Sequence, residues 1–78
     1  MKLDIITPQK TLFSGTVDSV TLPGTLGSFT ILTDHAPMIS SLRINGKISY
    51  TQETKTETLV IESGFAEVWK NHVIVCVE

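Results

Sequence analysis

The sequence predicts an all-β fold, a small antiparallel β-sandwich of two sheets with about five strands each. Apolar residues alternate with a period of two in most windows, and no window shows the apolar stripe of a helix. Turn signals recur about every 8–12 residues, which indicates roughly nine or ten short strands. Each strand has an apolar face to bury, and two small sheets packed face to face are the simplest way to bury them all.

The chain of 78 residues is short enough to be one domain, spanning residues 1–78. A domain of this size buries only about 60% of its unfolded surface, so it depends on its apolar core or on a partner that shares its surface. The single cysteine, Cys76, excludes an internal disulfide. With only two histidines, a closed Cys/His zinc site cannot form without carboxylates or a partner chain, and we expect no metal and no cofactor.

The charge pattern excludes further classes. The formal net charge is −2, and no Lys/Arg cluster exists that could provide a nucleic-acid footprint. No apolar stretch approaches the ~20 residues of a membrane-spanning helix. The N-terminus carries an acid and a proline where a signal peptide needs an apolar core, so we expect a cytoplasmic protein, which agrees with an unpaired cysteine.

The first strand is expected at residues 2–7, where apolar and charged residues alternate. Pro8 interrupts it, because proline cannot donate to a ladder. A short extended piece at 10–13 follows, and Ser14-Gly15 is expected to form a turn or a bulge.

The next strand is expected at residues 15–22. Val17 and Val20 are an odd number of residues apart, so a regular strand would place them on opposite faces. A β-bulge near Asp18-Ser19 would restore the phase. The alternative is a strand that is buried on both sides at one end.

The stretch from Ser28 to Leu32 carries no charge, which predicts a strand that is covered on both faces or faces a partner. Gly24 and Gly27 bracket a tight loop before this strand, and Asp34 to Pro37 form a polar corner after it. Such loops on a rigid sheet are where function concentrates.

In the second half of the chain, Asn45-Gly46 between two extended runs, 38–45 and 46–51, predicts a hairpin with a type I′ turn. The remaining elements that we expect are a polar turn at 52–55, a strand at 56–62, a break at 63–64, a strand at 65–69, a turn at 70–72 and a strand at 73–77. The last strand is apolar on both faces, so it is expected in the centre of a sheet.

No catalytic constellation is evident. Asp34 and His35 are adjacent, so on an extended backbone their side chains point opposite ways and make a poor acid–base pair. Asp34 is either an acceptor that shapes the corner or a partner contact. A metal site would need Asp34, His35, His72 and Cys76 to converge, and their spacing does not suggest it. We therefore expect a protein that is not an enzyme.

The loop between Gly24 and Gly27 has no following helix and no phosphate-binding lysine, so it is not typical of a nucleotide site. It is more simply a loop with positive φ at one or both glycines. Leu26 and Phe29 lie near its exposed tip. Apolar residues there suggest burial by something outside the domain.

Several motifs together resemble the epsilon subunit of F-type ATP synthases, over its N-terminal β-sandwich domain. The match covers essentially the whole chain, and its most specific parts are the His-Ala-Pro corner and the Gly-Phe-x-Glu-Val ending. The matching residues are Leu12-Phe13-Ser14-Gly15, Val17, Val20, Gly24, Gly27, Ile31-Leu32, His35-Ala36-Pro37-Met38-Ile39, Gly46-Lys47-Ile48, Gly64-Phe65-Ala66-Glu67-Val68, Asn71 and Val73.

The resemblance implies a ten-stranded sandwich in the central stalk, bound to the gamma subunit and resting on the ring of c subunits. It implies a non-catalytic subunit, held peripherally at the cytoplasmic face of the membrane through the complex, without lipid insertion. It also implies that the glycine loop and the His-Ala-Pro corner form one end of the sandwich, which meets these partners. The expected interface residues are Leu26, Gly27, Ser28, Phe29, Asp34, His35 and Met38, with Trp69 as a further candidate.

The chain departs from the family pattern in three ways. Ser28 stands where the family often has an acid, and Asp34 stands where a glycine is usual. We hypothesise that the negative charge has moved along the same end and still complements basic loops of the ring. Phe29-Thr30 replaces the usual Leu-Gly, which stiffens the loop. Many members continue into a pair of helices, which we expect to be absent because this chain ends at Glu78.

The alternative from another class is a free-standing β-sandwich that binds a ligand such as a carbohydrate. Carbohydrate sites usually present several aromatic side chains in a row, and a chain with one Tyr and one Trp has few to offer. An enzyme ranks last.

Overall fold

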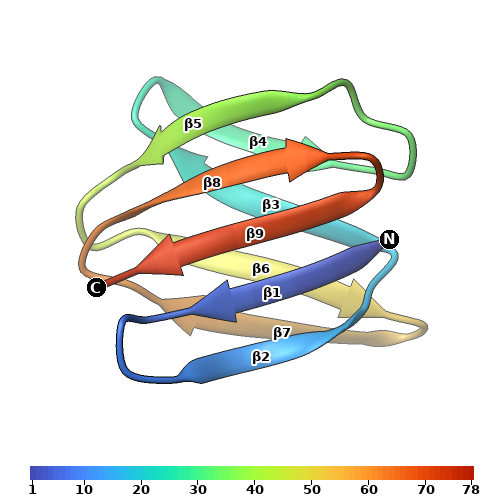
Figure 1. Ribbon diagram of the computed structural model, residues 1–78, viewed down its shortest axis with the longest axis horizontal. Coiled ribbons are helices and arrows are strands. Elements are labelled where there is room, and N and C mark those ends of the chain that lie inside the picture. Colours follow the sequence, from blue (N-terminus) through green and yellow to red (C-terminus); the bar gives the residue numbers. More distant parts are fainter.

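The computed structural model describes all residues, 1–78, and shows nine strands in two facing layers with no helix (Figure 1). The predicted all-β class is confirmed, with nine strands where the family resemblance implied ten. No helix is present that could cross a membrane. The strands are β1 (Lys2–Ile6), β2 (Thr11–Thr16), β3 (Ser19–Gly24), β4 (Gly27–Ile31), β5 (Met38–Leu42), β6 (Lys47–Gln52), β7 (Lys55–Val60), β8 (Gly64–Trp69) and β9 (His72–Val77).

The two layers are halves of one strongly curled sheet. The five-stranded layer has the order β2-β1-β9-β8-β5, and the four-stranded layer has the order β4-β3-β6-β7. A single bridging pair, Gly24 with Leu42, joins them. Neighbouring strands are antiparallel except for β1 and β9, which are parallel. Strand β9 lies between β1 and β8, so its predicted central position is confirmed.

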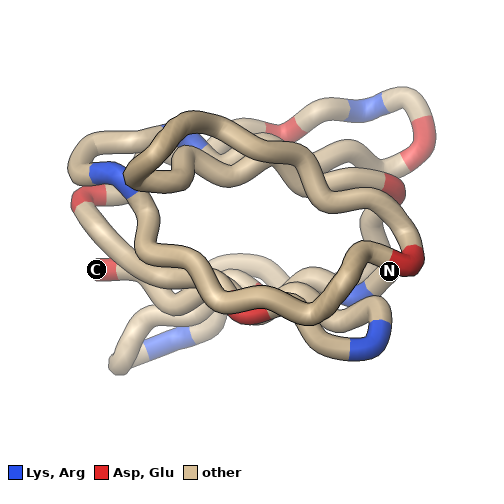
Figure 2. The backbone as a smooth tube through the Cα atoms, turned by 90° about the horizontal axis from the view of Figure 1, so that it is seen from above, with Lys and Arg blue, Asp and Glu red and all other residues tan.

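The core between the layers is entirely apolar. Figure 2, a view from above, shows the backbones of the two layers facing each other. Buried apolar side chains from both layers fill the space between them. No polar or charged residue is buried there. The core residues are Leu3, Ile5, Val17, Val20, Leu22, Ile31, Leu42, Ile48, Ile61, Ala66, Val68, Val73, Val75 and Val77.

The predicted turn at Ser14-Gly15 is wrong, because both residues lie within β2 and pair with Asp4 and Leu3. The irregularity falls two residues earlier. Ile5 pairs with Phe13 and Ile6 with Thr11, so the register skips Leu12 and the extra residue is accommodated there.

The predicted strand over residues 15–22 is also wrong, because β2 ends at Thr16 and β3 begins at Ser19. The two residues between them carry the chain from one layer to the other. Val17 N–H donates to the Met1 carbonyl, Asp18 N–H donates to the Thr51 carbonyl, and Val17 is buried. The odd spacing of the valines therefore reports a change of layer and not a bulge.

The predicted hairpin at Asn45-Gly46 is wrong as well. Strand β5 pairs with β8, whereas β6 pairs with β3 and β7, so these two residues also carry the chain between layers. Asn45 has the positive φ expected of it, at 57°, but Gly46 does not. Gly46 is needed for space, since a Cβ there would lie 2.6 Å from the Pro23 ring. The predicted polar turn at 52–55 is the tight β6–β7 hairpin.

Candidate partner interfaces

The expected interface residues do not gather at one end of the molecule. Leu26 and Gly27 lie at the β3–β4 turn, whereas Asp34 and His35 lie in the loop that follows β4. Strand β4 runs between these two places, so they occupy opposite ends of the sandwich (Figure 1). The glycine loop and the His-Ala-Pro corner therefore do not form one end of the sandwich, as the family resemblance implied, and the contact of these residues with partners stays a prediction.

The β3–β4 turn holds an apolar side chain out in solvent. Gly24 pairs with Gly27, which has a φ of 133°, and Leu26 between them is fully exposed. A Cβ at Gly24 would lie 2.7 Å from the Gly27 carbonyl oxygen, so the close approach of the two strands requires glycine. The turn thus presents Leu26 on a tight, well-defined support.

The charge-free strand β4 is an edge strand, because it pairs only with β3. Its alternate residues differ: Ser28 and Thr30 are exposed, whereas Phe29 is half-buried against the core. The Thr30 hydroxyl lies 2.9 Å from the hydroxyl of Thr21 on β3. The strand is therefore not covered on both faces, and a free backbone edge remains available to a partner.

At the other end, Asp34 and Asn71 fasten the loop after β4 to the β8–β9 turn. Asp34 N–H donates to Asn71 Oδ1 at 2.6 Å, and Asn71 Nδ2 donates to Asp34 Oδ1 at 3.0 Å. Both residues have positive φ, 65° and 60°, which suits their short polar side chains. Asp34 thus shapes the corner, which is one of the two roles that the sequence predicted for it. Its Oδ2 has no partner within the chain.

The neighbouring candidates in this loop are less available. His35 is half-buried, its N–H donates to the Leu32 carbonyl, and its Nδ1 lies 2.8 Å from the Ala36 carbonyl oxygen. Met38 is half-buried, pairs with Val68 and packs against the core. These contacts fix the conformation of the loop. Because Met38 packs against the core, only part of its side chain is free to contact a partner.

On the outer face of the five-stranded layer, the sequence reasoning singled out only Trp69. Alternation in β8 sends Ala66 and Val68 into the core and leaves Phe65, Glu67 and Trp69 on the outside. The signal was present, because the Phe65–Trp69 stretch alternates and β9 is apolar on both faces. Ile39 on β5 is exposed on the same outer face, opposite Glu67.

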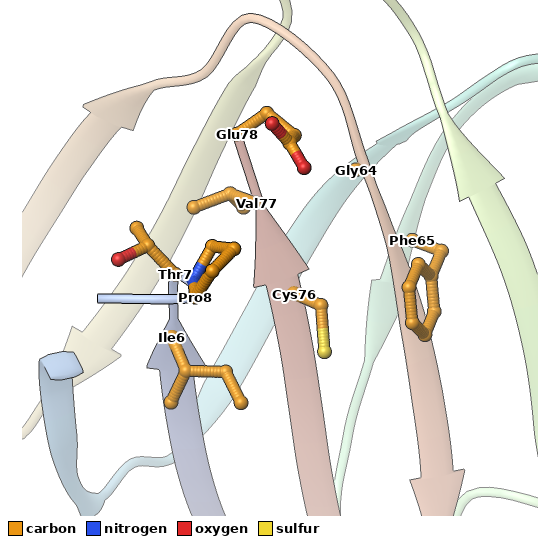
Figure 3. A pocket seen from close by; sticks show the side chains of 8 residues that line it. All are labelled: Ile6, Thr7, Pro8, Gly64, Phe65, Cys76, Val77 and Glu78. Atoms are coloured by element: carbon orange, nitrogen blue, oxygen red, sulfur yellow. The ribbon is translucent and has the colours of Figure 1, made fainter. Parts of the chain in front are cut away.

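A hollow of about 280 Å³ lies on this outer face beside the C-terminal end of β9. Figure 3 shows Cys76 between Phe65 on one side and Ile6 on the other, which agrees with the strand register. The hollow is lined by Ile6, Thr7, Pro8, Gly64, Phe65, Cys76, Val77 and Glu78. It contains no cluster of polar groups that could orient a reacting molecule.

An ion pair joins β1 and β9 on the same face. His72 Nε2 lies 2.6 Å from Asp4 Oδ2, and both side chains are partly exposed. Hydrogen bonds from Ser14 and then from His72 lower the pKa of Asp4. In the other layer, burial and secondarily the Glu57 carboxylate raise the pKa of Tyr50.

The four residues considered for a metal site do not converge. Asp34 is bonded to Asn71, His72 is paired with Asp4, and Cys76 is half-buried on β9. No group of three or more His, Cys, Asp or Glu side chains is placed to hold a metal ion.

Residues 1–78, the whole chain, match the family described as "ATP synthase, Delta/Epsilon chain, beta-sandwich domain". The chain belongs to this delta/epsilon family. The family resemblance seen in the sequence motifs is thereby confirmed.

Curated relatives in the family are ATP synthase epsilon chains. The chain is 46% identical over 78 residues to that of Chlorobium limicola, covering 99% of this chain and 88% of the relative. It is 44% identical over 75 residues to that of Carboxydothermus hydrogenoformans, covering 96% and 55%. It is 43% identical over 77 residues to that of Chlorobaculum tepidum, covering 97% of this chain and 86% of the relative. The chain thus spans most of the Chlorobium limicola and Chlorobaculum tepidum proteins and about half of the Carboxydothermus hydrogenoformans protein.

Solved structures share the fold at low sequence identity. A chain of the Tetrahymena thermophila mitochondrial ATP synthase central stalk/c-ring superposes with a TM-score of 0.79 at 17% identity, covering 97% of this chain and 61% of that one. A chain of the Euglena gracilis mitochondrial ATP synthase, from an OSCP/F1/c-ring structure, gives 0.88 at 20% identity, covering 96% and 48%. At this identity the two structures show that the fold is shared.

Proposed function

We propose that this protein is a non-catalytic rotor subunit of an F-type ATP synthase, which couples the gamma subunit to the c ring in the central stalk. The observation that supports this most strongly is the family match over residues 1–78, with 46% identity to an epsilon chain of which the chain covers 88%. The complex is membrane-bound, and we place the domain peripherally at the cytoplasmic face of the cell membrane. The family relationship offers no support for a carbohydrate-binding module.

The mechanism is mechanical. Torque passes through a domain only if its layers resist sliding, and here 36 backbone hydrogen bonds join the strands into one continuous curled sheet. The interior is close-packed and wholly apolar, so shearing one layer over the other would open voids in the core. A stiff block of this kind transmits force between neighbours without chemistry of its own.

Binding to a gamma subunit is the direct test of the function. The purified chain is mixed with a recombinant gamma subunit and followed by analytical ultracentrifugation. A stoichiometric complex is expected, because coupling requires an interface of the order of ~2,000 Å². A chain that stays monomeric beside folded gamma would contradict the proposal.

The loop that carries Asp34 offers a contact with basic loops of the ring. Because Asn71 occupies only Oδ1, the other carboxylate oxygen can accept from a lysine or arginine. Asp34→Asn is expected to make the assembled complex dissociate at lower salt, since an exposed charge pair is screened by ions. Ser28 and Asp34 lie at opposite ends of β4, so the charge has not moved along one end, and the hypothesis is corrected to a contact of Asp34 alone. Unchanged salt stability of the Asp34→Asn complex would rule out that contact.

A further inference from the structure

Strand β4 leaves a row of backbone groups without hydrogen-bond partners, since no strand lies beyond it (Figure 1). On β3, the Pro23 carbonyl accepts from Arg43 N–H on the side of β5, so the backbone groups of Pro23 point away from β4. Ser28 lies opposite Pro23 in the β3–β4 register, and such a pair is not hydrogen-bonded. The N–H and C=O groups of Ser28, and of Thr30 two residues further on, therefore point to the free side of β4. We call these four groups the β4 edge.

The other edges of the sheet are protected against pairing. On β5, the Ser41 carbonyl already accepts from Thr25 N–H at the end of β3. Strand β7 carries Lys55 and Glu57, and the register of β2 skips Leu12. Charges and bulges both hinder the addition of a further strand. Strand β4 has neither of them and no proline, so its edge is a template for pairing with another chain.

The β4 edge is complementary to itself. Ser28 and Thr30 lie on either side of Phe29, so an antiparallel second copy centred on Phe29 would set Ser28 of each chain opposite Thr30 of the other. Each of these two pairs exchanges two hydrogen bonds, which gives every group of the β4 edge a partner. The hydroxyls of Ser28 and Thr30 would face each other as well. They would extend the cross-strand contact that already sets Thr30 2.9 Å from Thr21.

The centre of such a seam is apolar. Phe29 is half-buried against the core and would lie opposite Phe29 of the second copy. That pair is not hydrogen-bonded, which is the arrangement in which side chains of facing strands come closest. Aromatic pairs across antiparallel strands are stabilising, and β4 has no charge that would be brought against its own copy.

We propose that the β4 edge binds the β4 edge of a second copy of this chain, so that the free chain forms a two-fold dimer with one continuous sheet across the seam. The proposal goes beyond the rotor function and does not depend on it, because it concerns the chain outside any complex. A seam of five residues from each chain is short of the ~20–30 residues a side of a stable interface. The dimer is therefore reversible, with a dissociation constant of the order of 0.1 mM.

Exchange of backbone amides with water, measured by NMR at about 20 µM and about 1 mM chain, tests the pairing residue by residue. The Ser28 and Thr30 amides should exchange about fivefold more slowly at the higher concentration, because most chains are then paired. The Phe29 amide points toward β3 and should change little. Sedimentation equilibrium over the same range should show monomer converting to dimer.

Two double variants with the same added charge locate the seam. Ser28→Lys with Thr30→Lys sets lysines directly opposite each other twice across the two-fold axis, so dimerisation should be lost. Thr56→Lys with Thr58→Lys makes the matched change at exposed positions of β7 and should dimerise like the wild type. The amide spectrum of each variant shows that it is folded.

Three results would overturn the proposal. One is a wild type that stays monomeric at about 1 mM, and another is a dimer that the β4 lysines leave intact. The third is protection of the Ser28 and Thr30 amides by stoichiometric gamma subunit but not by a high concentration of the chain alone, since the occupant of the β4 edge is then another protein. The rotor function is tested separately by binding to gamma and stands or falls without the dimer.

Discussion

Single polar residues on the surface of this sandwich fasten strands that are distant in the chain. Asp4 and His72 are 68 positions apart, and their side chains connect the parallel strands β1 and β9. Ser14, which lies opposite Asp4 in the β1–β2 register, is the largest cause of the lowered pKa of Asp4. No position in the sequence signals the contact of Asp4 with His72, because it depends on the parallel insertion of β1 beside β9.

The lowered pKa of Asp4 predicts a pH dependence of stability. A carboxyl whose pKa is lower in the folded chain stabilises the fold above its unfolded value, near 3.9, and this contribution is lost as the pH falls through the folded pKa. In Asp4→Asn, the free energy of unfolding should therefore fall less steeply than in the wild type below about pH 4. Urea unfolding over a pH series measures both slopes.

In His72→Ala, the free energy of unfolding should still fall with pH, but less steeply than in the wild type. The effect is only partial because Ser14, the largest cause of the lowered pKa of Asp4, remains in that variant. Parallel pH profiles for Asp4→Asn and the wild type would show that the carboxylate contributes nothing to acid sensitivity.

At the scale of elements, the turns decide the topology. The loop after β4 is shaped by Asp34 and Asn71, each of which holds the other at positive φ. Glycine tolerates positive φ but has no side chain to bond with. Asn71→Gly therefore removes the fastening and leaves the backbone conformation intact.

We expect Asn71→Gly to speed hydrogen exchange of the loop amides at 33–35 by about tenfold, while amides in the core strands keep their protection. Exchange followed by mass spectrometry or NMR measures both. Asp34→Gly removes only the bond from Asn71 Nδ2 and keeps the one donated by the backbone N–H of residue 34, so it should speed exchange of the loop amides less than Asn71→Gly does. Equal protection of the loop in Asn71→Gly and the wild type would mean that the side-chain bonds do not order it.

A second prediction at this scale concerns close packing of strands. A Cβ at Gly64 would fall on the carbonyl oxygen of Cys76, and Gly64 has no positive φ, so space alone requires glycine there. Gly64→Ala is expected to lower the free energy of unfolding by about 1–3 kcal/mol. Gly15→Ala is the control, because its nearest neighbour is the movable ring of Phe13, at 3.1 Å. Urea unfolding of both variants is the measurement, and equal losses would contradict the packing argument.

Alternation along the chain predicted the strands well, because it depends only on which residues face the core. It did not predict which strands pair. Asn45-Gly46 has the composition of a hairpin turn, yet the same residues serve a layer crossing, where Gly46 makes room for Pro23. The separation of the β3–β4 turn from the loop after β4 could have been predicted from the sequence, since the five residues of β4 between them span ~15 Å. The Asp34–Asn71 contact could not have been predicted, because it joins residues 37 positions apart in the chain.

The whole molecule depends on one core shared by both layers. Leu3 on β1 and Leu22 on β3 are both fully buried, one from each layer. Deleting either side chain leaves a cavity that both layers border, so its effect should not stay within one layer. This coupling is what a torque-bearing block requires.

Leu3→Ala and Leu22→Ala are each expected to lower the free energy of unfolding by about 2–5 kcal/mol. The chain carries its own reporters, since the single Trp69 lies in the five-stranded layer and the single Tyr50 in the four-stranded layer. In both variants, the Trp69 and Tyr50 transitions in urea should keep a common midpoint, because one core makes unfolding all-or-none. The fully exposed Leu26, changed to Ala, should leave the midpoint where it is. If Leu3→Ala moved the Trp69 transition alone, the layers would unfold separately, and the stiffness on which the rotor mechanism depends would be lost.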